Sequence, residues 1–352
     1  MSEFTIRSSL GDYSIEVALG ASASAGDVQV ALIDPIVRDR MRFPSNRIIE
    51  IEGSEGAKTL AGCEVVLVSM NRAGLTRGDI VAAVGGGVIQ DVATLTTSLY
   101  MRGVSWVYVP TTLMAMADSC IGGKSSINAG GIKNLVGNFN PPARIFIDPQ
   151  FIPTLPRRAI VSGLAEAVKI CFARGGDSFE TFLQLGASQA PAADEDTVRL
   201  LTHVLQAKKW FVETDEFDKK ERQLLNFGHS FGHAWEASCD FSIQHGVGVA
   251  AGMLAALRHP ASARTPLTEK LEAYTFDLLS SVKEDVAGAL DQTDWSLFPS
   301  ALRGDKKNAR DILRLVLPIT GESVGITELS LDNEQLTLAT NSLRQALEEV
   351  VQ

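Results

Sequence analysis

Asp79-Ile-Val-Ala-Ala-Val-Gly-Gly-Gly-Val-Ile-Gln-Asp91 is the stretch that decides the fold. An apolar run from Asp79 to Val84 predicts a buried strand, and Val88 to Leu99 predicts a helix with Asp91 in its first turns. The triplet Gly85, Gly86 and Gly87 joins the two. Glycine lets backbone amides approach a phosphate at the positive end of a helix, so this junction favours a nucleotide cofactor. A tight turn without a ligand is the alternative explanation for three glycines alone.

Similar short apolar runs surround this stretch in the first part of the chain. They are Asp27 to Asp34, Arg47 to Gly53, Cys63 to Met70, Trp106 to Pro110 and Arg144 to Asp148. Strands separated by connections of helix length predict a parallel sheet with its functional loops at the carboxyl ends of the strands. After Pro153-Thr-Leu-Pro156 the periodicity becomes helical, and β runs nearly vanish until Ile312 to Leu317. We expect a Rossmann-like nucleotide-binding α/β domain over residues 1–150 and a mostly helical metal- and substrate-binding domain over residues 151–352.

Composition and charge limit the classes of protein to which this chain can belong. A chain of 352 residues with 45% hydrophobic content can bury a large core, most readily as two domains. The formal net charge of −10 and the lack of a basic run argue against a nucleic-acid or anionic membrane partner. The four cysteines have no metal-site or disulfide spacing, and no apolar stretch has the length of a membrane span. We therefore expect a cytoplasmic protein.

Three of the five histidines cluster in one part of the sequence. His229 and His233 are four residues apart in Asn226-Phe-Gly-His-Ser-Phe-Gly-His233, and His245 opens His-Gly-Val-Gly-Val249. On a helix the first two share a face and can hold a metal, while His233 is also a possible acid–base group. Any one of them alone is as well explained as a core residue. The cluster favours a metal site.

A carboxylate that can complete such a site occurs in Ser162-Gly-Leu-Ala-Glu-Ala-Val-Lys169. Glu166 and Lys169 lie on one helical face, where an exposed ion pair is the alternative. A site with three protein ligands leaves positions open for substrate oxygens, as in catalytic zinc centres.

Anion-binding groups surround these motifs. The glycine-rich loop from Ala117 to Asn134 carries Asp118, Lys124, Lys133 and Asn134, although a solvated flexible loop is the alternative. Arg222 and Asn226 precede His229 by one or two helical turns, and Lys208 lies on an earlier helix, where a solvated helix face is the alternative. Asp34 ends the first strong strand, where it can accept from a ribose hydroxyl or cap a helix.

These motifs together resemble the 3-dehydroquinate synthase family and its sugar phosphate cyclase relatives. The resemblance rests on Gly85 to Asp91, Tyr100 to Gly103, Pro110 to Leu113, Asp118 to Lys124, Lys133 with Asn134, Gly163 to Glu166, Leu225 to His233 and Asp305 to Lys307. It implies NAD and a divalent metal, zinc or cobalt, as cofactors, and a homodimer as the assembly.

The resemblance also implies a role for each matching residue. The metal ligands would be Glu166, His229 and His245. The NAD contacts would be Asp34, Glu55, Lys58, Gly85, Gly86, Gly87, Asp91, Thr111, Thr112, Asp118 and Lys133. The substrate and proton-handling residues would be Lys124, Asn134, Lys169, Lys208, Arg222, Asn226, His233, one of the pair Lys306 and Lys307, and Arg102, which would reach across the dimer.

The reaction implied is the conversion of a phosphorylated seven-carbon sugar, 3-deoxy-D-arabino-heptulosonate 7-phosphate, to 3-dehydroquinate and phosphate. It would proceed by transient oxidation with NAD, phosphate elimination, reduction and an intramolecular aldol, in the shikimate pathway. Val247 and Gln90 depart from the family pattern, in which Glu and Gly are common. A cyclitol synthase acting on sedoheptulose 7-phosphate is one alternative, and a metal-dependent polyol dehydrogenase, which would release NADH, is another.

Overall fold

The structure is a computed structural model that describes residues 1–26, 28–185, 190–305, 307–321 and 323–352. The chain forms two compact units. Unit 1 comprises Met1–Leu155 and Pro191–Glu216, and unit 2 comprises Pro156–Ala190 and Phe217–Gln352. Residues 191–216 thus pack with the first unit. From the sequence we expected one boundary near residue 150, whereas the chain passes from unit 1 to unit 2, back to unit 1 and again to unit 2.

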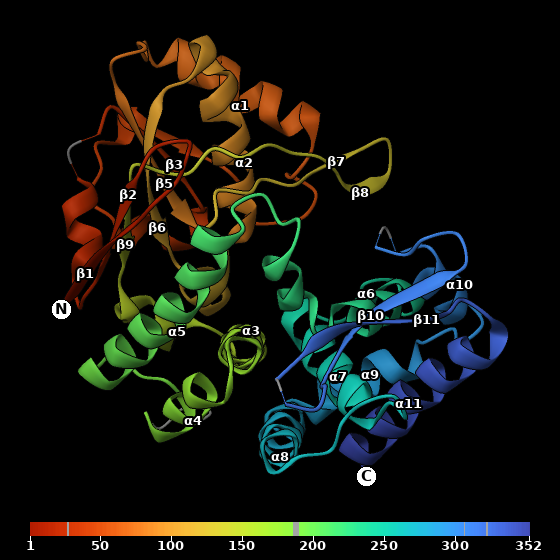
Figure 1. Cartoon of the computed structure of the whole chain (residues 1–352). Coiled ribbons are helices and arrows are strands. Elements are labelled where there is room, and N and C mark those ends of the chain that lie inside the picture. The colour runs from red at the N-terminus through yellow and green to blue at the C-terminus, as the bar shows by residue number, and fades with distance from the viewer. Residues whose placement is uncertain (27, 186–189, 306, 322) are drawn as a thin grey trace. The chain divides into compact units, whose positions relative to one another are not determined.

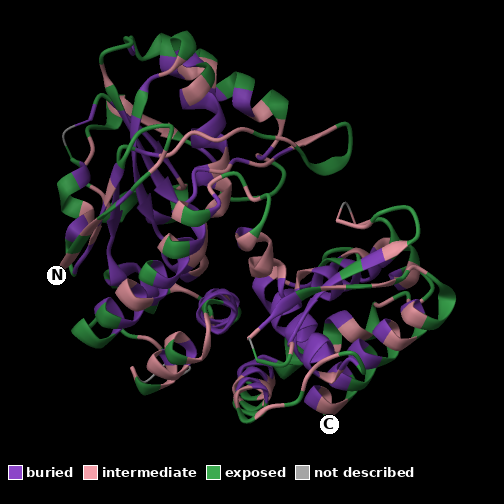
Figure 2. Ribbon diagram, in the orientation of Figure 1, coloured by how far each residue is buried: buried purple, intermediate pink, exposed green. Residues whose placement is uncertain are grey.

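Unit 1 is built on a seven-stranded sheet in the order β1-β2-β9-β6-β5-β3-β4. Its strands are β1 (Ser2–Ile6), β2 (Tyr13–Val17), β3 (Val30–Ile33), β4 (Ile48–Glu50), β5 (Ile80–Gly85), β6 (Ser105–Pro110) and β9 (Arg144–Ile147). All neighbouring pairs are parallel except β1 with β2, a hairpin that the sequence did not reveal. Central strands such as β3 and β6 are almost entirely buried, which explains their continuous apolar runs (Figure 2).

The glycine junction connects β5 to α2 (Gly87–Leu99) as predicted. A Cβ atom at Gly85 would lie 2.3 Å from the Ile89 side chain, and one at Gly86 would lie 2.9 Å from Thr112. Larger residues at these two positions would push the strand end away from the helix and from β6. The Tyr108 hydroxyl donates to the Gly85 carbonyl at 3.0 Å, which holds the turn from beneath.

The prediction of a strand over Cys63 to Met70 was wrong, because this segment belongs to helix α1 (Leu60–Arg72). Its β-branched valines resemble a strand, but the buried residues Cys63, Val66 and Met70 recur at helical spacing. The Thr59 side chain caps the helix by accepting from the Gly62 amide at 3.0 Å. The periodicity and the cap outweigh β propensity here.

Helices and short turns complete unit 1. Helix α2 packs on β5 and β6, whereas α5 (Glu195–Thr214) contacts β1 and β2 (Figure 1). The shorter elements are η1 (Ala21–Ala25), η2 (Pro35–Arg40), η3 (Ser45–Arg47), η4 (Tyr100–Arg102), the π-helical turn η5 (Ala115–Ser119), the hairpin β7 (Ile127–Ala129) and β8 (Ile132–Val136), and η6 (Pro149–Thr154).

Unit 2 is mostly helical, so the predicted combination of an α/β part with a helical part is confirmed. Its helices are α3 (Arg157–Arg174), α4 (Gly176–Gln184), η7 (Glu221–Asn226), α6 (His229–Ser238), α7 (His245–Arg258), α8 (Pro266–Ser280), α9 (Lys283–Asp291), α10 (Phe298–Arg303) and α11 (Asn333–Val351). Helix α7 lies at the centre, in contact with α3, α6, α8 and α11. An antiparallel hairpin, β10 (Ile312–Leu317) with β11 (Gly325–Ser330), packs beside it. Within the described ranges, no helix has both the length and the apolar character needed to cross a bilayer.

Candidate metal and cofactor sites

Glycines bring the histidines of unit 2 together. A Cβ atom at Gly232 would lie 2.7 Å from the Gly248 carbonyl oxygen, and one at Gly252 would lie 1.9 Å from that of Gly228. Helices α6 and α7 can therefore approach at backbone distance. His229 is the first residue of α6 and His245 the first of α7, and their ring centroids are 5.3 Å apart.

The predicted ligands converge on one point. The Oε1 atom of Glu166, in the middle of α3, lies 3.6 Å from His229 Nε2 and 3.4 Å from His245 Nε2. Donor atoms bound at about 2.0–2.2 Å to a tetrahedral ion lie about 3.3–3.6 Å from one another. The three side chains therefore have the spacing and the donor chemistry to hold a divalent metal.

Hydrogen bonds orient these donors. His229 Nδ1 lies 3.3 Å from the Phe227 carbonyl oxygen, which selects Nδ1 as the protonated nitrogen and leaves Nε2 free to bind a cation. Lys169 pairs with Oε2, the other oxygen of Glu166, and both side chains are buried. The alternative interpretation, an exposed Glu166–Lys169 ion pair, is therefore wrong.

The charges of the cluster follow from burial. Burial raises the pKa of Glu166, but Lys169 and His245 outweigh it and hold that pKa below its usual range. Burial, reinforced by Lys169, lowers the pKa of His229 far below its usual value, and burial with His245 lowers the pKa of His233 to about 4. Burial alone would lower the pKa of His245, but Glu166 and Glu236 raise it to about 10. A metal held by Glu166, His229 and His245 would bind both imidazoles in their neutral form. It would therefore have to displace a proton from His245.

His233 extends the cluster by one helical turn. Donor atoms of His229, His233 and His245 all lie within 4.8 Å of one another, so a set of three histidines is a second possible ligand set. The two sets share His229 and His245. The more exposed His233 is available to exchange protons with solvent or a substrate.

A lysine lies at the start of α6. Lys307 Nζ is 3.1 Å from Asp305 and 3.3 Å from Ser230 Oγ, and Ser230 donates to Asp305 at 2.9 Å. Sequence reasoning missed Ser230, which follows His229 and ties the Asp305 loop to α6. The other lysine of the predicted pair, Lys306, lies outside the described residues.

Two more predicted residues occur in η7, just before α6. Arg222 is buried, and Asn226 donates from Nδ2 to the Gln223 carbonyl at 2.9 Å.

Several predicted cofactor residues meet at the carboxyl ends of adjacent strands in unit 1. Asp34 follows β3, the glycine triplet begins with the last residue of β5, and Thr111 and Thr112 follow β6. The Thr111 amide donates to the Gly85 carbonyl at 3.0 Å. Asp34 also caps η2 by accepting from the Ile36 amide at 3.1 Å, as the alternative interpretation expected.

A buried ion pair lies next to this edge. Lys58 Nζ is 2.8 Å from Asp91 Oδ2 and 3.9 Å from Glu55. Asp91 also accepts from the Ser126 amide at 2.9 Å. Burial nevertheless dominates and raises the pKa of Asp91 to about 6. Asn128 donates to Glu55 at 3.1 Å, so this loop is linked to strand β7.

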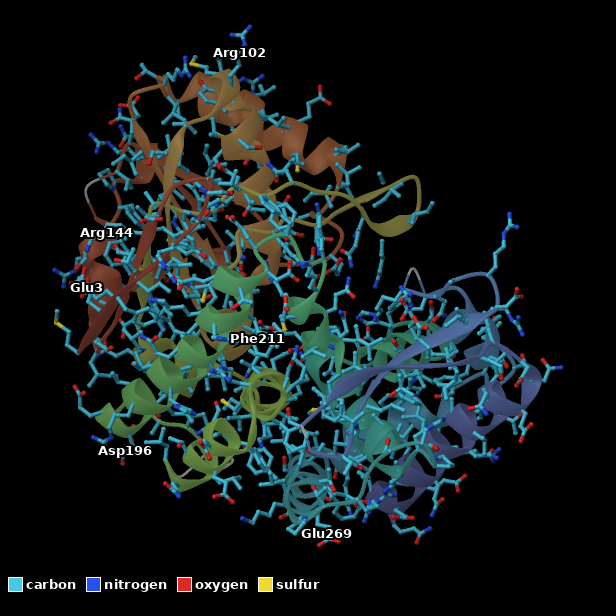
Figure 3. The ribbon with its side chains drawn as sticks, in the orientation of Figure 1. Glu3, Arg102, Arg144, Asp196, Phe211 and Glu269 are labelled. Carbon is cyan, nitrogen blue, oxygen red and sulfur yellow. The ribbon has the colours of Figure 1, made fainter. Side chains whose placement is uncertain are left out.

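Lys208 projects from α5 toward the π-helical turn η5. It forms an ion pair with Asp118 and also donates to the Asp118 carbonyl, and it is 4% exposed. The solvated helix face considered for Lys208 was therefore wrong. Phe211, one turn later on α5, is fully buried (Figure 3). Gln90, which was not predicted as a site residue, forms two hydrogen bonds of 2.6 Å with Ser119. Its Nε2 donates to the Ser119 carbonyl, and its Oε1 accepts from the Ser119 hydroxyl.

The rest of the glycine-rich loop is more ordered than the flexible-loop alternative. Lys124 forms an antiparallel bridge with Phe139, and Lys133 and Asn134 lie exposed on strand β8. Asn134 has a φ of 54° and its amide donates to Asn128 at 2.9 Å. Arg102 is exposed at the end of η4 (Figure 3).

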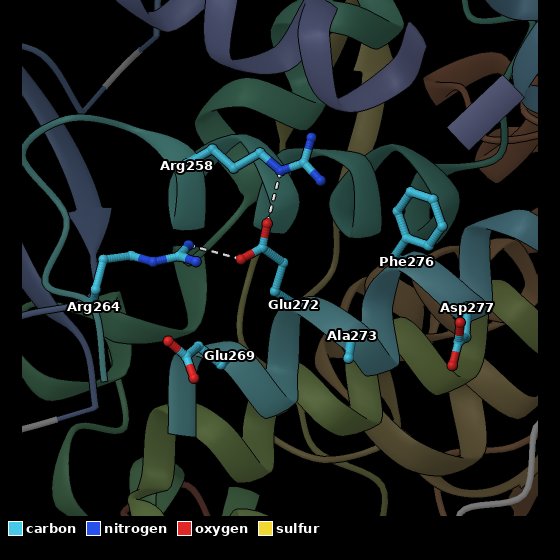
Figure 4. A pocket seen from close by; sticks show the side chains of 7 residues that line it. All are labelled: Arg258, Arg264, Glu269, Glu272, Ala273, Phe276 and Asp277. Atoms are coloured by element: carbon cyan, nitrogen blue, oxygen red, sulfur yellow. Dashed lines mark hydrogen bonds and ion pairs between the residues drawn. The ribbon is translucent and has the colours of Figure 1, made fainter. Parts of the chain in front are cut away.

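A cavity of about 390 Å³ lies on α8 in unit 2 (Figure 4). Its lining residues are Arg258, Arg264, Glu269, Glu272, Ala273, Phe276 and Asp277, and among the described residues none of these was predicted as a site residue. Glu272 accepts from Arg258 at 2.9 Å and from Arg264 at 2.7 Å. Both arginines of this cavity are therefore paired with Glu272, and the predicted metal ligands are not among its described lining residues.

Comparison with a solved structure defines the fold class. The chain superposes on 2-deoxy-scyllo-inosose synthase complexed with carbaglucose-6-phosphate, NAD+ and Co2+ with a TM-score of 0.78 and 22% identity, covering 98% of this chain and 99% of that one. The two proteins share a fold.

Sequence comparison then defines the family. Residues 48–162 match the 3-dehydroquinate synthase N-terminal family and residues 163–308 match the 3-dehydroquinate synthase C-terminal family. The chain is 38% identical over 232 residues to 3-dehydroquinate synthase of Lactiplantibacillus plantarum, a match that spans 64% of each chain. It is 34% identical over 278 residues to that of Pyrobaculum aerophilum, covering 79% of this chain and 80% of the relative. The chain belongs to the 3-dehydroquinate synthase family.

Proposed function

We propose that this protein is a 3-dehydroquinate synthase, an NAD- and metal-dependent lyase that converts 3-deoxy-D-arabino-heptulosonate 7-phosphate to 3-dehydroquinate and phosphate. The observation that carries the proposal is the convergence of Glu166, His229 and His245 in a chain that both family profiles match. This activity would place the protein in the shikimate pathway, which leads to the aromatic amino acids.

The bound groups would supply two kinds of chemistry: NAD a reversible hydride acceptor, and the divalent metal a Lewis acid for a substrate oxygen. The protein's own residues would do the rest. Glu166, His229 and His245 would hold the metal, and Lys169 would keep Glu166 ionised through its second oxygen. The glycine triplet, with Thr111 and Thr112, would receive the cofactor at the carboxyl edge of the sheet.

The substrate would be bound mainly through its two anionic groups. Lys208 and Arg222 are buried cations suited to a carboxylate, while Lys124, Asn134, Asn226 and Lys307 would hold the phosphate and hydroxyls. Since Lys208 pairs with Asp118, a substrate carboxylate would share this lysine with Asp118. Because its pKa is lowered to about 4, His233 would be neutral at neutral pH and so in the base form that can take a proton transiently from the substrate.

The test is phosphate release by purified zinc-loaded protein with NAD. We expect release from 3-deoxy-D-arabino-heptulosonate 7-phosphate and none from sedoheptulose 7-phosphate, with no accumulation of NADH. Lys208→Ala and Arg222→Ala should each lower kcat/KM for the acid by about 10²-fold or more, as expected for a lost charge-assisted contact. Lys209→Ala, a change to the next and more exposed lysine of α5, is the matched control.

A cyclitol synthase is the second candidate. Its support is the shared fold with 2-deoxy-scyllo-inosose synthase, whose bound carbaglucose-6-phosphate carries no carboxylate, together with Val247 and Gln90, which depart from the family pattern. Release of phosphate from sedoheptulose 7-phosphate alone would favour this candidate. Stoichiometric NADH without phosphate release would instead indicate a polyol dehydrogenase.

The proposal includes a homodimer in the cytoplasm. Val65, Val68, Leu99 and Met101 expose apolar side chains on α1, at the end of α2 and on η4, beside Arg102. Met101→Glu should shift the chain from dimer to monomer in sedimentation, and Arg102→Ala should lower activity without changing the assembly. The cysteines Cys63, Cys120, Cys171 and Cys239 are buried free thiols, which suits a reducing compartment.

A further inference from the structure

His245 is held from two sides, although it begins a helix without a side-chain cap of its own. On one side the Gly246 amide donates to Ser162 Oγ at 3.0 Å, and a Cβ atom at Gly246 would lie 2.2 Å from the Ser162 carbonyl oxygen. This contact presses the first turn of α7 onto α3, the helix of Glu166. On the other side the ring meets the carboxylate of Glu236, at 3.0 Å from Nδ1 to Oε1.

The place of Glu236 is built into the packing of α6 and α7. The residue is 8% exposed. A Cβ atom at Gly248 would lie 2.9 Å from Glu236 Oε1, so a glycine one turn after His245 makes room for the carboxylate. A carboxylate removed from water is costly unless a partner compensates it, and here the partner is the imidazole.

The hydrogen bond determines which nitrogen of His245 faces the cluster. If Nδ1 donates to Glu236, Nε2 is the nitrogen directed at Glu166 Oε1, at 3.4 Å. His229 reaches the same arrangement with the Phe227 carbonyl oxygen in place of a carboxylate. Both histidines therefore direct Nε2 at Glu166, while Nδ1 meets a different partner in each case. Of these two Nδ1 partners, the Phe227 carbonyl oxygen is neutral and the Glu236 carboxylate is anionic.

We propose that Glu236 is a positioning residue that orients His245 and strengthens its binding to a divalent metal. The proposal rests on the proposed function, because it takes the metal from there. A carboxylate behind a ligating imidazole fixes the ring and raises its basicity as a ligand, and losing such a partner weakens metal binding by about 10–100-fold. The two carboxylates, Glu236 at Nδ1 and Glu166 at Nε2 of the same ring, also supply negative charge that a dication would balance.

The experiment measures metal affinity directly, without substrate. Metal-free protein is titrated with Zn2+ in competition with a chromophoric chelator, and with Co2+ while its visible absorption bands are recorded. We expect Glu236→Ala to weaken both affinities by about 10–100-fold and to change the cobalt spectrum. Glu236→Gln, which keeps the volume and one acceptor oxygen, should lie between Glu236→Ala and the parent protein.

Asp240→Asn is the matched control, since it removes one negative charge four residues later, at an exposed position after the end of α6. It should leave both affinities and the cobalt bands unchanged. A folded Glu236→Gln or Glu236→Ala variant with the metal affinity and the cobalt bands of the parent protein would overturn the proposal. Failure of the parent protein itself to bind either Zn2+ or Co2+ would also overturn it.

The outcomes also separate this inference from the proposed function. Weaker metal binding in the Glu236 variants, with no phosphate release by the parent protein, would remove the proposed function and keep the inference. Normal phosphate release by the parent protein, with unchanged metal affinity in both Glu236 variants, would keep the proposed function and remove the inference about Glu236.

Discussion

The candidate sites of the two units handle charge in opposite ways. In unit 1 the charged groups are already matched: Lys58 pairs with Asp91, and Lys208 pairs with Asp118. In unit 2, His229 and His245 both direct a ring nitrogen at Glu166 Oε1, and His233 lies beside these two histidines. A matched set of charges keeps its shape without a ligand, whereas a set of converging donors gains most when a cation arrives.

The largest expected effect follows from removing a converging donor. His229→Ala should abolish tight metal binding and lower phosphate release by about 10³-fold or more, because the lost Lewis acid supplies several kcal/mol of transition-state stabilisation. Metal content by elemental analysis and steady-state kinetics measure the two effects. His203→Ala, on α5 in unit 1, should change activity by less than about twofold. Near-parental activity in His229→Ala would erase the contrast between the two units.

Breaking the ion pair of Lys58 with Asp91 in unit 1 should lower the stability of the fold more than it lowers catalytic activity. Lys58→Met removes a cation whose side chain is 9% exposed and leaves Asp91 at 17% exposure without its lysine. We expect a loss of about 2–4 kcal/mol, less than for a fully buried pair because the Ser126 amide and solvent still reach Asp91. Thermal unfolding, with NAD affinity by calorimetry, measures the change. The exposed pair of Arg38 with Glu50 offers a control, as Arg38→Met should cost below about 1 kcal/mol. Equal losses in the two variants would contradict the importance of burial.

The pH dependence of stability sharpens the same contrast. Burial raises the pKa of Asp91 to about 6 from 3.8, so the folded chain retains a proton that the unfolded chain releases between these values. The contribution of Asp91 to the free energy of unfolding therefore falls as pH rises through this window, by about 3 kcal/mol at most. In Asp91→Asn this contribution is removed. Denaturant unfolding at pH 4, 5 and 6 should show a flatter dependence than in the parent protein, and identical slopes would show that Asp91 does not titrate there.

The smallest effect concerns the link between Gln90 and Ser119. Gln90→Ala removes two hydrogen bonds worth about 1 kcal/mol each and frees the turn that carries Asp118. We expect a lower thermal midpoint, a KM for NAD raised by about two- to fivefold and a nearly unchanged kcat. Ser119→Ala, which loses only the bond from its hydroxyl, should show about half the effect on stability. A large fall in kcat would mean that Gln90 does more than hold the turn.

The sequence was most informative where spacing and chemistry agree. The order strand, glycine triplet, helix predicted β5 and α2 correctly, and the interval between His229 and His233 predicted one helical face. The helix α1 was mistaken for a strand because the β-branched content of Cys63 to Met70 concealed a helical repeat of buried residues. The hairpin of β1 with β2 was missed, although Tyr13-Ser-Ile-Glu-Val17 alternates apolar and polar residues, which is a strand signal in the sequence itself.

Burial and outer partners were harder to predict. Lys208 and the pair Glu166 with Lys169 were compared with solvated helix faces, although all three side chains are buried. Nothing local in the sequence reports burial of a charged residue, because the partner of Lys208 is far away in the chain, in Asp118. Glu236 was missed as well, yet it lies three residues after His233, a helical spacing that offered a signal.

The segment Pro191–Glu216 also bears on how the protein is made. Unit 1 is interrupted in sequence, and its amino-terminal hairpin is tied to the end of α5, where Arg7 pairs with Glu213 at 2.9 Å and Ser9 bonds to Glu216 at 2.7 Å. A nascent chain that stops near residue 155 has all seven strands of the sheet but lacks the helix that covers β1 and β2. On the ribosome, the first part of the protein to be synthesised therefore has to wait for a later part before its fold can close.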